Sequence, residues 1–224
     1  MGLSVFEIIG PPMVGPSSSH TAGASRIGWA ARALLAERPV SARIFLHGSF
    51  FATGDGHGTK EALAAGLLGM APDDERLKDA LQLAETESLA VSFGETDLGP
   101  QAHPNSASLH LEGVSRRLSM TASSIGGGSI VITEIDGLPA EIRGTLETLL
   151  LWHRDTPGFL ARVTAVLACV EINVASIRTG RLDRGENAVT AVEIDGSFPP
   201  EVPALLGKTP AISRLAVMPV LPGF

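Results

Sequence analysis

A chain of 224 residues, 44% of them hydrophobic, is long enough for one large domain or two small ones with real cores. Its 17 basic and 24 acidic residues leave a net charge of −7, which no cluster of Lys and Arg offsets. This balance argues against nonspecific binding of nucleic acid.

The single cysteine, Cys169, excludes an internal disulfide bond. It also excludes an iron–sulfur cluster held by this chain alone, because such clusters take several thiolates. Residues 1–6 contain no basic segment, and no apolar run reaches the length that spans a membrane. We therefore expect a cytoplasmic protein without a membrane segment.

Residues 15–23 are rich in hydroxyl groups and precede a predicted helix that runs to about residue 37. A helix N-terminus exposes unpaired N–H groups and a partial positive charge, so it suits a carboxylate or a phosphate. Within this stretch, His20 can exchange a proton near neutral pH. The same residues also fit a simple N-cap, in which one serine caps the helix and the others are solvated.

A strand predicted over residues 40–46 leads into a glycine-rich stretch, residues 47–59, and then a helix over residues 59–68. Three glycines within five residues of this stretch indicate special backbone angles or a close approach to the backbone. His57 lies here, just before the helix. A histidine in such a loop is often a surface turn residue, but the arrangement around His20 occurs here a second time.

Further along, Pro104 favours an extended backbone at His103 and leaves its ring projecting, while Asn105 offers a donor and an acceptor. We expect a helix at 73–85, strands at 89–93 and 130–135, and a hairpin of residues 106–112 and 115–122. Between the strands at 115–122 and 130–135, the sequence has three successive glycines, residues 126–128. Their N–H groups can converge on an anion, or the glycines form a flexible turn. Together, these motifs suit the binding of a small carboxylate and the transfer of a proton, but they lack an electrophile.

The rest of the chain reads as a βαββαβ unit of the ferredoxin-like kind. The apolar run 145–153 predicts a buried strand, a turn at 155–158 opens a helix that closes near 171–173, and Cys169 is expected in its core. The remaining elements are predicted as strands at 174–182, 188–194 and 212–217 and a short helix at 200–206.

Four motifs, at residues 15–21, 53–59, 103–105 and 125–128, together resemble the β subunit of the bacterial iron–sulfur L-serine dehydratase. The last part of the chain is similar to ACT domains, and the first resembles the allosteric substrate-binding domain of some phosphoglycerate dehydrogenases. The resemblance implies an α+β fold: a serine dehydratase β domain over residues 1–143, followed by a ferredoxin-like ACT domain over residues 144–224.

The resemblance further implies that the chain deaminates L-serine to pyruvate and ammonia, together with an α subunit whose cysteines ligate a [4Fe–4S] cluster. It places no metal ligand on this chain. The implied catalytic residues are His20, His57 and His103, with either His57 or His20 as the proton-transfer group. The implied substrate-binding residues are Ser18, Ser19, Thr21, Asn105, Gly126, Gly127 and Gly128, the glycines offering N–H groups to the carboxylate.

For the ACT domain, the resemblance implies edge-to-edge homodimers that bind an amino-acid effector. The implied effector-binding residues are Asp155, Pro157, Gly158 and Asn173. Two other functions stay open on the sequence: a non-catalytic regulatory subunit whose first domain senses serine, and a stand-alone ACT-type binding protein without a catalytic partner.

Overall fold

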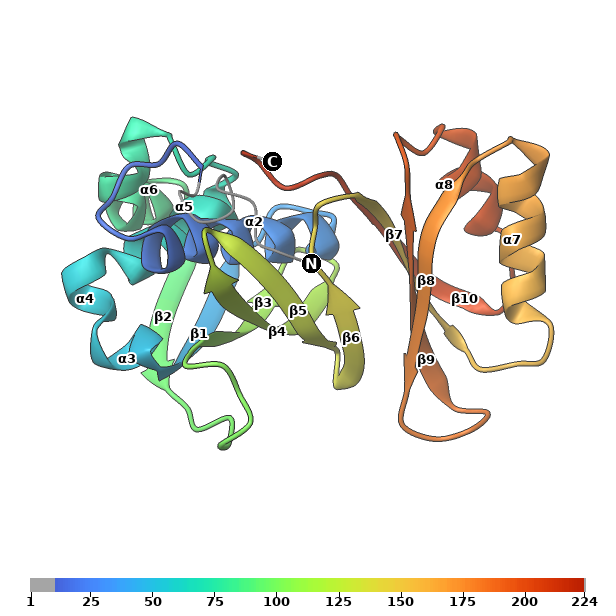
Figure 1. Ribbon diagram of the computed structural model, residues 1–224, viewed down its shortest axis with the longest axis horizontal. Coiled ribbons are helices and arrows are strands. Elements are labelled where there is room, and N and C mark those ends of the chain that lie inside the picture. The colour runs from blue at the N-terminus through green and yellow to red at the C-terminus, as the bar shows by residue number, and fades with distance from the viewer. Residues whose placement is uncertain (1–10, 224) are drawn as a thin grey trace.

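The computed structural model describes residues 11–223, which form two β-sheets with their own helices (Figure 1). The first sheet has the strand order β2-β1-β3-β4-β5-β6, in which β1 and β2 run parallel and all other neighbours are antiparallel. Its strands are β1 (Ser41–Gly48), β2 (Ala90–Glu95), β3 (Asn105–Glu112), β4 (Arg117–Gly126), β5 (Ser129–Ile135) and β6 (Leu138–Ile142).

The helices of this first unit gather on one face of the sheet (Figure 1). They are the π-helix η1 (Ser18–Gly23), α2 (Ala24–Leu35), α3 (Ser49–Ala52), α4 (Gly54–His57), α5 (Thr59–Leu68), the 3-10 helix η2 (Glu75–Asp79) and α6 (Ala80–Thr86). α2 and α5 approach closely because two glycines lack side chains: a Cβ on Gly28 would collide with the backbone of Leu63, and one on Gly66 with that of Ser25. Alternate strand residues such as Ile44 and Leu109 fill the core beneath these helices.

The second unit confirms the predicted βαββαβ order. It consists of β7 (Glu147–Arg154), α7 (Phe159–Cys169), β8 (Val174–Arg181), β9 (Asn187–Ile194), α8 (Glu201–Leu206) and β10 (Ile212–Met218). Its antiparallel strands lie in the order β10-β7-β9-β8. Leu149 and Leu151 of β7 pack in a core with α7 and α8, whereas Leu150 and Trp152 join the core of the first unit. This double burial explains the unbroken apolar run of β7.

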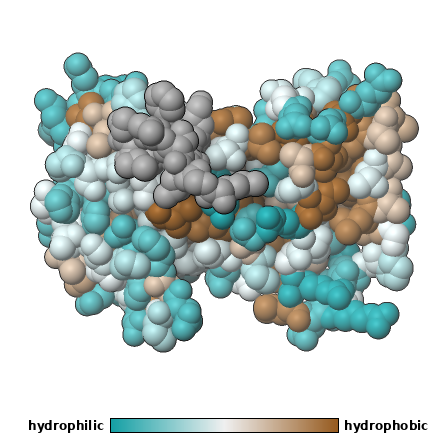
Figure 2. Space-filling model, in the orientation of Figure 1, coloured by the Kyte–Doolittle hydropathy of each residue, from teal (hydrophilic) through white to brown (hydrophobic). Residues whose placement is uncertain are grey.

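Apolar side chains gather on the visible face of the second unit, where α7 and α8 meet β8 (Figure 2). Part-buried Val174 and Ile177 of β8 pack against the core beneath these helices. β8 is hydrogen-bonded to β9 alone among the described strands, so its other edge is unpaired. This side of the unit thus combines an open strand edge with apolar surface.

Two parts of the first unit differ from the sequence-based expectation. The sequence predicts a turn at residues 136–139, but β6 is a strand there. Pro139 and the short length of β6 weaken the strand pattern, while its edge position tolerates both. The glycine-rich stretch 47–59 contains two single-turn helices, α3 and α4. The sequence also predicts a short element over residues 4–9, which lie outside the described residues.

The expectation that Cys169 is a core residue is wrong, since it is exposed at the last position of α7. Phe159, Val163 and Leu167 form the buried face of this helix at a spacing of four. Cys169 comes two residues after Leu167, about 200° further around the helix, and so faces away from the sheet. No helix within residues 11–223 is long and apolar enough to cross a membrane.

Candidate functional site

His20 lies in the π-helical turn η1 with only 8% of its surface exposed. Its Nε2 lies 3.3 Å from the hydroxyl of Ser49 and 3.2 Å from that of Thr53, both on the segment after β1. Its Nδ1 lies 3.4 Å from the hydroxyl of Ser17, which is the N-cap and accepts from the backbone N–H of His20 at 3.2 Å. One serine therefore caps the helix, as the simpler interpretation expected, and three hydroxyl groups surround the imidazole.

These hydrogen bonds fit a neutral ring. Ser17 accepts from the backbone and so has its own proton to donate to Nδ1, while Thr53 donates to the Ser49 carbonyl at 3.0 Å and so accepts from Nε2–H. Burial lowers the pKa of His20, a backbone interaction with Ser49 raises it in part, and the neighbouring His57 lowers it again. Both nitrogens of His20 are therefore engaged within the protein.

His57 ends α4 beside His20, with their ring centroids 5.0 Å apart. Its Nδ1 is buried and has no hydrogen-bond partner among the described residues. A buried ring nitrogen without a partner is costly unless another molecule satisfies it. Of the two histidines, His57 is the one whose ring nitrogens make no hydrogen bond within the described residues, and it is half-buried where His20 is buried.

Thr21, expected among the substrate-binding residues, has a different position. Only 1% of it is exposed, and its hydroxyl donates to the His57 carbonyl at 3.3 Å. It thus joins η1 to α4 instead of facing a ligand, because it points into the contact between these two helical turns. Ser18 and Ser19 are half-buried in the first turn of η1.

His103 lies in the loop before β3. Its Nδ1 accepts from the backbone N–H of Asn105 at 3.1 Å, which places the proton of a neutral ring on Nε2. The adjacent Pro104 carbonyl accepts from the Phe50 N–H of α3 at 3.3 Å, and the ring of Phe50 meets His20 edge-on, with centroids 5.3 Å apart. α3 therefore brings the His103 loop close to the His20 site.

The His103 ring also lines a cavity of about 590 Å³ with several hydroxyl groups. Ser106, Ser108, Thr121 and Ser123 contribute them from β3 and β4. Ser106 and Ser123 are hydrogen-bonded to each other at 2.7 Å. The cavity is thus polar and adjoins the loop that holds His103.

Gly126, Gly127 and Gly128 make the turn between β4 and β5, with φ angles of 113°, 58° and 77° that favour glycine. The turn lies against η1, since a Cβ on Gly128 would lie 3.3 Å from that of Ala22. Ala22 and His20 are two residues apart on a helical turn and point to different sides of it. The structure therefore places the glycine turn beside η1 but not on the side that His20 occupies.

Two residues at the site, Ser49 and Thr53, are not among the catalytic or substrate-binding residues predicted from the sequence. They lie four residues apart, the spacing that brings side chains to one face of a helix, and each has a hydroxyl within 3.3 Å of His20. That spacing within the stretch 47–59 is the signal by which they are recognisable. The helix α3 has only four residues and is flanked by glycines, so it shows no helical spacing of apolar residues.

In the second unit, Asp155 and Gly158 line a cavity of about 550 Å³ at the start of α7, with Pro157 in the same turn. The Asp155 carboxylate accepts from Gly185 N–H at 3.1 Å and pairs with Arg181, and these contacts lower its pKa.

Thr156 also lines this cavity, and its hydroxyl is buried without a partner among the described residues. Asn173 lies beyond the far end of α7, where it donates to Asp195 at 2.6 Å. The structure therefore gathers three of the four expected effector residues in one turn and leaves Asn173 away from them.

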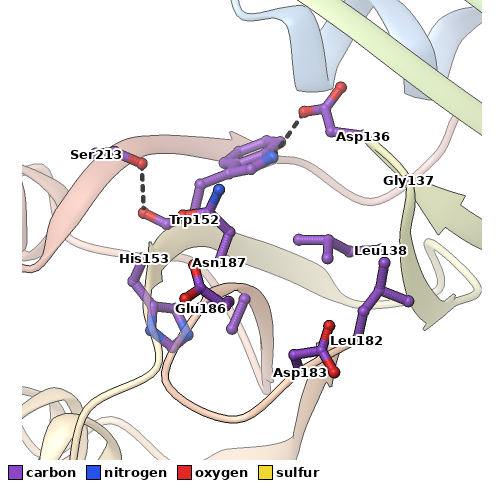
Figure 3. A pocket seen from close by; sticks show the side chains of 11 residues that line it. Asp136, Gly137, Leu138, Trp152, His153, Leu182, Asp183, Glu186, Asn187 and Ser213 are labelled. Atoms are coloured by element: carbon purple, nitrogen blue, oxygen red, sulfur yellow. Dashed lines mark hydrogen bonds between the residues drawn. The ribbon is translucent and has the colours of Figure 1, made fainter.

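A cavity of about 420 Å³ lies where the turn after β5 meets the second sheet (Figure 3). Trp152 lines it and donates from Nε1 to Asp136 of the first unit at 2.7 Å. The Arg214 guanidinium lies 4.2 Å from the Trp152 ring centroid and 3.6 Å from the Asp136 carboxylate. These three side chains form a polar contact between the two units.

The described residues offer no ligand set for an iron–sulfur cluster. No three His, Cys, Asp or Glu side chains within residues 11–223 lie close enough together to hold a metal ion. Cys169 is exposed on α7, in the second unit. An iron–sulfur cluster takes several thiolates, so the described part of the chain, with one cysteine, does not fit such a cluster.

Comparison with known proteins finds a matching family and several relatives. The family model described as "Serine dehydratase beta chain" matches residues 4–135. The "Probable L-serine dehydratase, beta chain" of Bacillus subtilis (strain 168) is 42% identical over 212 residues, covering 95% of this chain and 96% of that one. The "L-serine dehydratase, beta chain" of Peptoniphilus asaccharolyticus is 41% identical over 86% of this chain and 87% of that one. The L-serine dehydratase of Mycobacterium bovis is 32% identical over 85% of this chain but only 45% of that one.

Proposed function

This chain belongs to the serine dehydratase beta chain family, and we propose that it is the β subunit of an L-serine ammonia-lyase that forms pyruvate and ammonia. The observation that carries the proposal is the pair of His20 and His57, whose ring centroids are 5.0 Å apart. One imidazole is fully hydrogen-bonded and the other has a buried nitrogen without a partner among the described residues. Such a pair suits proton transfer to or from a small substrate.

We assign different roles to the two histidines. His57 is the proton-transfer group, because neither of its ring nitrogens makes a hydrogen bond within the described chain and the residue is only half-buried. His20 is a positioning residue, because Ser17, Ser49 and Thr53 occupy its nitrogens and its ring supports that of His57. We also keep His103 as a catalytic residue, which lies in the neighbouring loop before β3.

For the substrate, we propose that Ser18, Ser19 and Asn105 supply hydrogen bonds and that Gly126, Gly127 and Gly128 offer N–H groups to the carboxylate. The half-buried serines lie in the first turn of η1, and the glycine turn lies against the same helical turn at Ala22. A helical N-terminus there favours a negative charge.

We propose that a separate α subunit completes the site and holds the [4Fe–4S] cluster. The names of the Bacillus subtilis and Peptoniphilus asaccharolyticus relatives support this, because a beta chain is one part of a protein of several chains. The described residues fit no cluster of their own, so we derive no step of the reaction through it.

Co-expression with such a cysteine-bearing subunit tests the proposal. We expect pyruvate formation from L-serine by the assembled pair and none from either chain alone. Replacement of His57 by Ala has to remove this activity while the two chains still copurify. An assembled pair without turnover, or one that works equally well without His57, contradicts the proposal.

A second function, regulation, is favoured by the cavity at the start of α7, where the Thr156 hydroxyl is buried without a partner in the described chain. We propose that residues 144–224 form an ACT domain, that the turn of Asp155, Pro157 and Gly158 takes an amino-acid effector, and that copies associate along β8. The unpaired edge of β8 and the apolar surface beside it support the association.

Calorimetric titration with amino acids, together with sedimentation of the full chain, tests this second function. We expect binding and a dimer, both weakened by Thr156→Tyr, which fills the cavity. A chain that stays monomeric at high concentration and binds no amino acid refutes the regulatory role without touching the catalytic one.

A further inference from the structure

Residues 219–223, which we call the return segment, run from β10 back to the first unit (Figure 1). Leu221 is 1% exposed and belongs to the core of that unit. Its backbone N–H donates to the Gly144 carbonyl at 2.9 Å, and a Cβ on Gly144 would collide with its side chain. The return segment is therefore packed into the first unit and is not a loose extension of β10.

Arg26, in the first turn of α2, joins the return segment to the glycine turn. It is 1% exposed, and its Nε and Nη2 donate to the carbonyls of Pro222 and Gly223 at 2.9 and 2.8 Å. Its Nη1 donates to the Gly128 carbonyl at 2.7 Å. Burial lowers the pKa of Arg26 to about 10, which leaves it charged at neutral pH. The planar guanidinium fork suits three such fixed contacts, whereas an ammonium group does not.

The second unit also holds the other end of α2. From β10, Arg214 donates through Nη2 to the Leu34 carbonyl at 2.6 Å. η1 continues directly into α2, since Ala24 has the helical angles φ −64° and ψ −43°. His20 lies six residues before Arg26 on this run. Contacts from the second unit therefore hold both ends of the helix that carries His20.

We propose that Arg26 is a positioning residue for the His20 site, and that the return segment is the link through which the second unit fixes η1. The inference rests on the proposed function, because it takes the pair of His20 and His57 as the catalytic site. His20 meets Ser49 and Thr53 from α3 and its following turn, so a shift of η1 moves the imidazole relative to its hydroxyl partners. Small displacements of such groups are expensive in catalysis.

Two substitutions loosen the link from opposite sides. Arg26→Lys keeps the charge but loses the fork that reaches three carbonyls. Leu221→Ala removes the side chain that seats the return segment in the core of the first unit. The matched controls are Arg32→Lys on the same helix, whose Nη1 donates to Leu67 within the first unit, and Leu205→Ala, which is 53% exposed on α8.

Hydrogen exchange of residues 18–24 in the full chain and steady-state kinetics of the assembled pair with L-serine are the two measurements. We expect faster exchange in both test variants and a fall in kcat/KM of about tenfold, the scale of a coupling between separate sites. Both controls have to match the unmodified protein in exchange and in kcat/KM.

Wild-type exchange at residues 18–24 in Leu221→Ala overturns the inference, and this variant decides it even where Arg26→Lys fails to fold. Faster exchange with an unchanged kcat/KM also overturns it, since the link then only stabilises the fold. An unmodified pair without L-serine turnover refutes the proposed function instead, and exchange still reports whether the return segment holds η1.

Discussion

The imidazole rings of His20 and His57 lie 5.0 Å apart, centroid to centroid, yet their hydrogen-bonding environments are opposite. The first is 8% exposed with hydroxyl groups near both nitrogens, and the second has a buried Nδ1 without a partner in the described chain. The two histidines lie in similar sequence motifs, but the hydrogen-bond partners of their rings differ. Substitutions at the two positions are therefore expected to have different effects.

His57→Ala is expected to lower kcat of the assembled pair by about a hundredfold or more, the scale of general acid–base groups. Its free energy of unfolding stays near that of the unmodified chain, because no hydrogen bond within the described protein is lost at Nδ1. His110→Ala is the control, since His110 is half-buried in β3 and contacts Phe45 edge-on at 5.7 Å. A kcat that is unchanged, or that falls only in step with unfolding, contradicts the assignment.

His20→Ala is expected to lower both activity and stability. It removes the ring that the hydroxyls of Ser17, Ser49 and Thr53 surround, at a cost of about 1–3 kcal/mol in the free energy of unfolding. Urea denaturation beside steady-state rates checks this. A stable His20→Ala protein with unchanged hydrogen exchange around Thr53 contradicts the positioning role.

The stability of the chain is expected to fall in mild acid partly because of His20. Burial lowers the pKa of His20 in the folded state, so the unfolded chain binds this proton more readily. The stabilisation is fully present above the usual histidine pKa of about 6.5 and is lost as pH falls from there through the lower folded-state pKa. His20→Gln removes this part of the pH dependence.

Urea denaturation at neutral pH and in mild acid measures how much of the free energy of unfolding depends on His20, with His110→Gln as the control. His153, whose pKa burial also lowers, is present in every variant, so only the difference between variants counts. The same loss in acid with and without His20 refutes the prediction.

The strand and helix periods predicted most of both units, including the helix at residues 59–68 and the βαββαβ order. They did not predict the side-chain partners that depend on contacts between distant segments. Ser49 and Thr53 become partners of His20 only because α3 folds toward η1. Likewise, Trp152 reads as one more apolar residue of β7, and only the docking of the units gives its Nε1 a carboxylate.

Gly66→Ala is expected to destabilise the first unit by about 1–3 kcal/mol, the cost of overpacking a core. Its Cβ would collide with the backbone of Ser25, so α2 and α5 would have to separate. Gly56→Ala is the matched control in stability measurements, because no atom lies within 4 Å of its added Cβ. Equal free energies of unfolding for the two variants would show that the close helix crossing is not what requires Gly66.

Trp152→Phe is expected to weaken the contact between the units while keeping the apolar ring in place. The lost bond is the one from Nε1 to the Asp136 carboxylate at 2.7 Å, and hydrogen bonds to charged groups contribute about 1.5–3 kcal/mol. The loss is expected at the lower end of that range, because the Asp136 side chain is 31% exposed and also accepts from Ser119 N–H.

A double-mutant cycle with Asp136→Asn, measured by urea unfolding, isolates this bond from the general effect of each substitution. We expect the double variant to be more stable than the sum of the two single losses predicts, by at least about 0.5 kcal/mol. Phe at position 152 keeps the aromatic face for Arg214, whose guanidinium lies 4.2 Å from the ring centroid, so the cycle does not report that contact. Strict additivity would show that Trp152 joins the units through its apolar ring alone, and that the Asp136 carboxylate is held by its other partners.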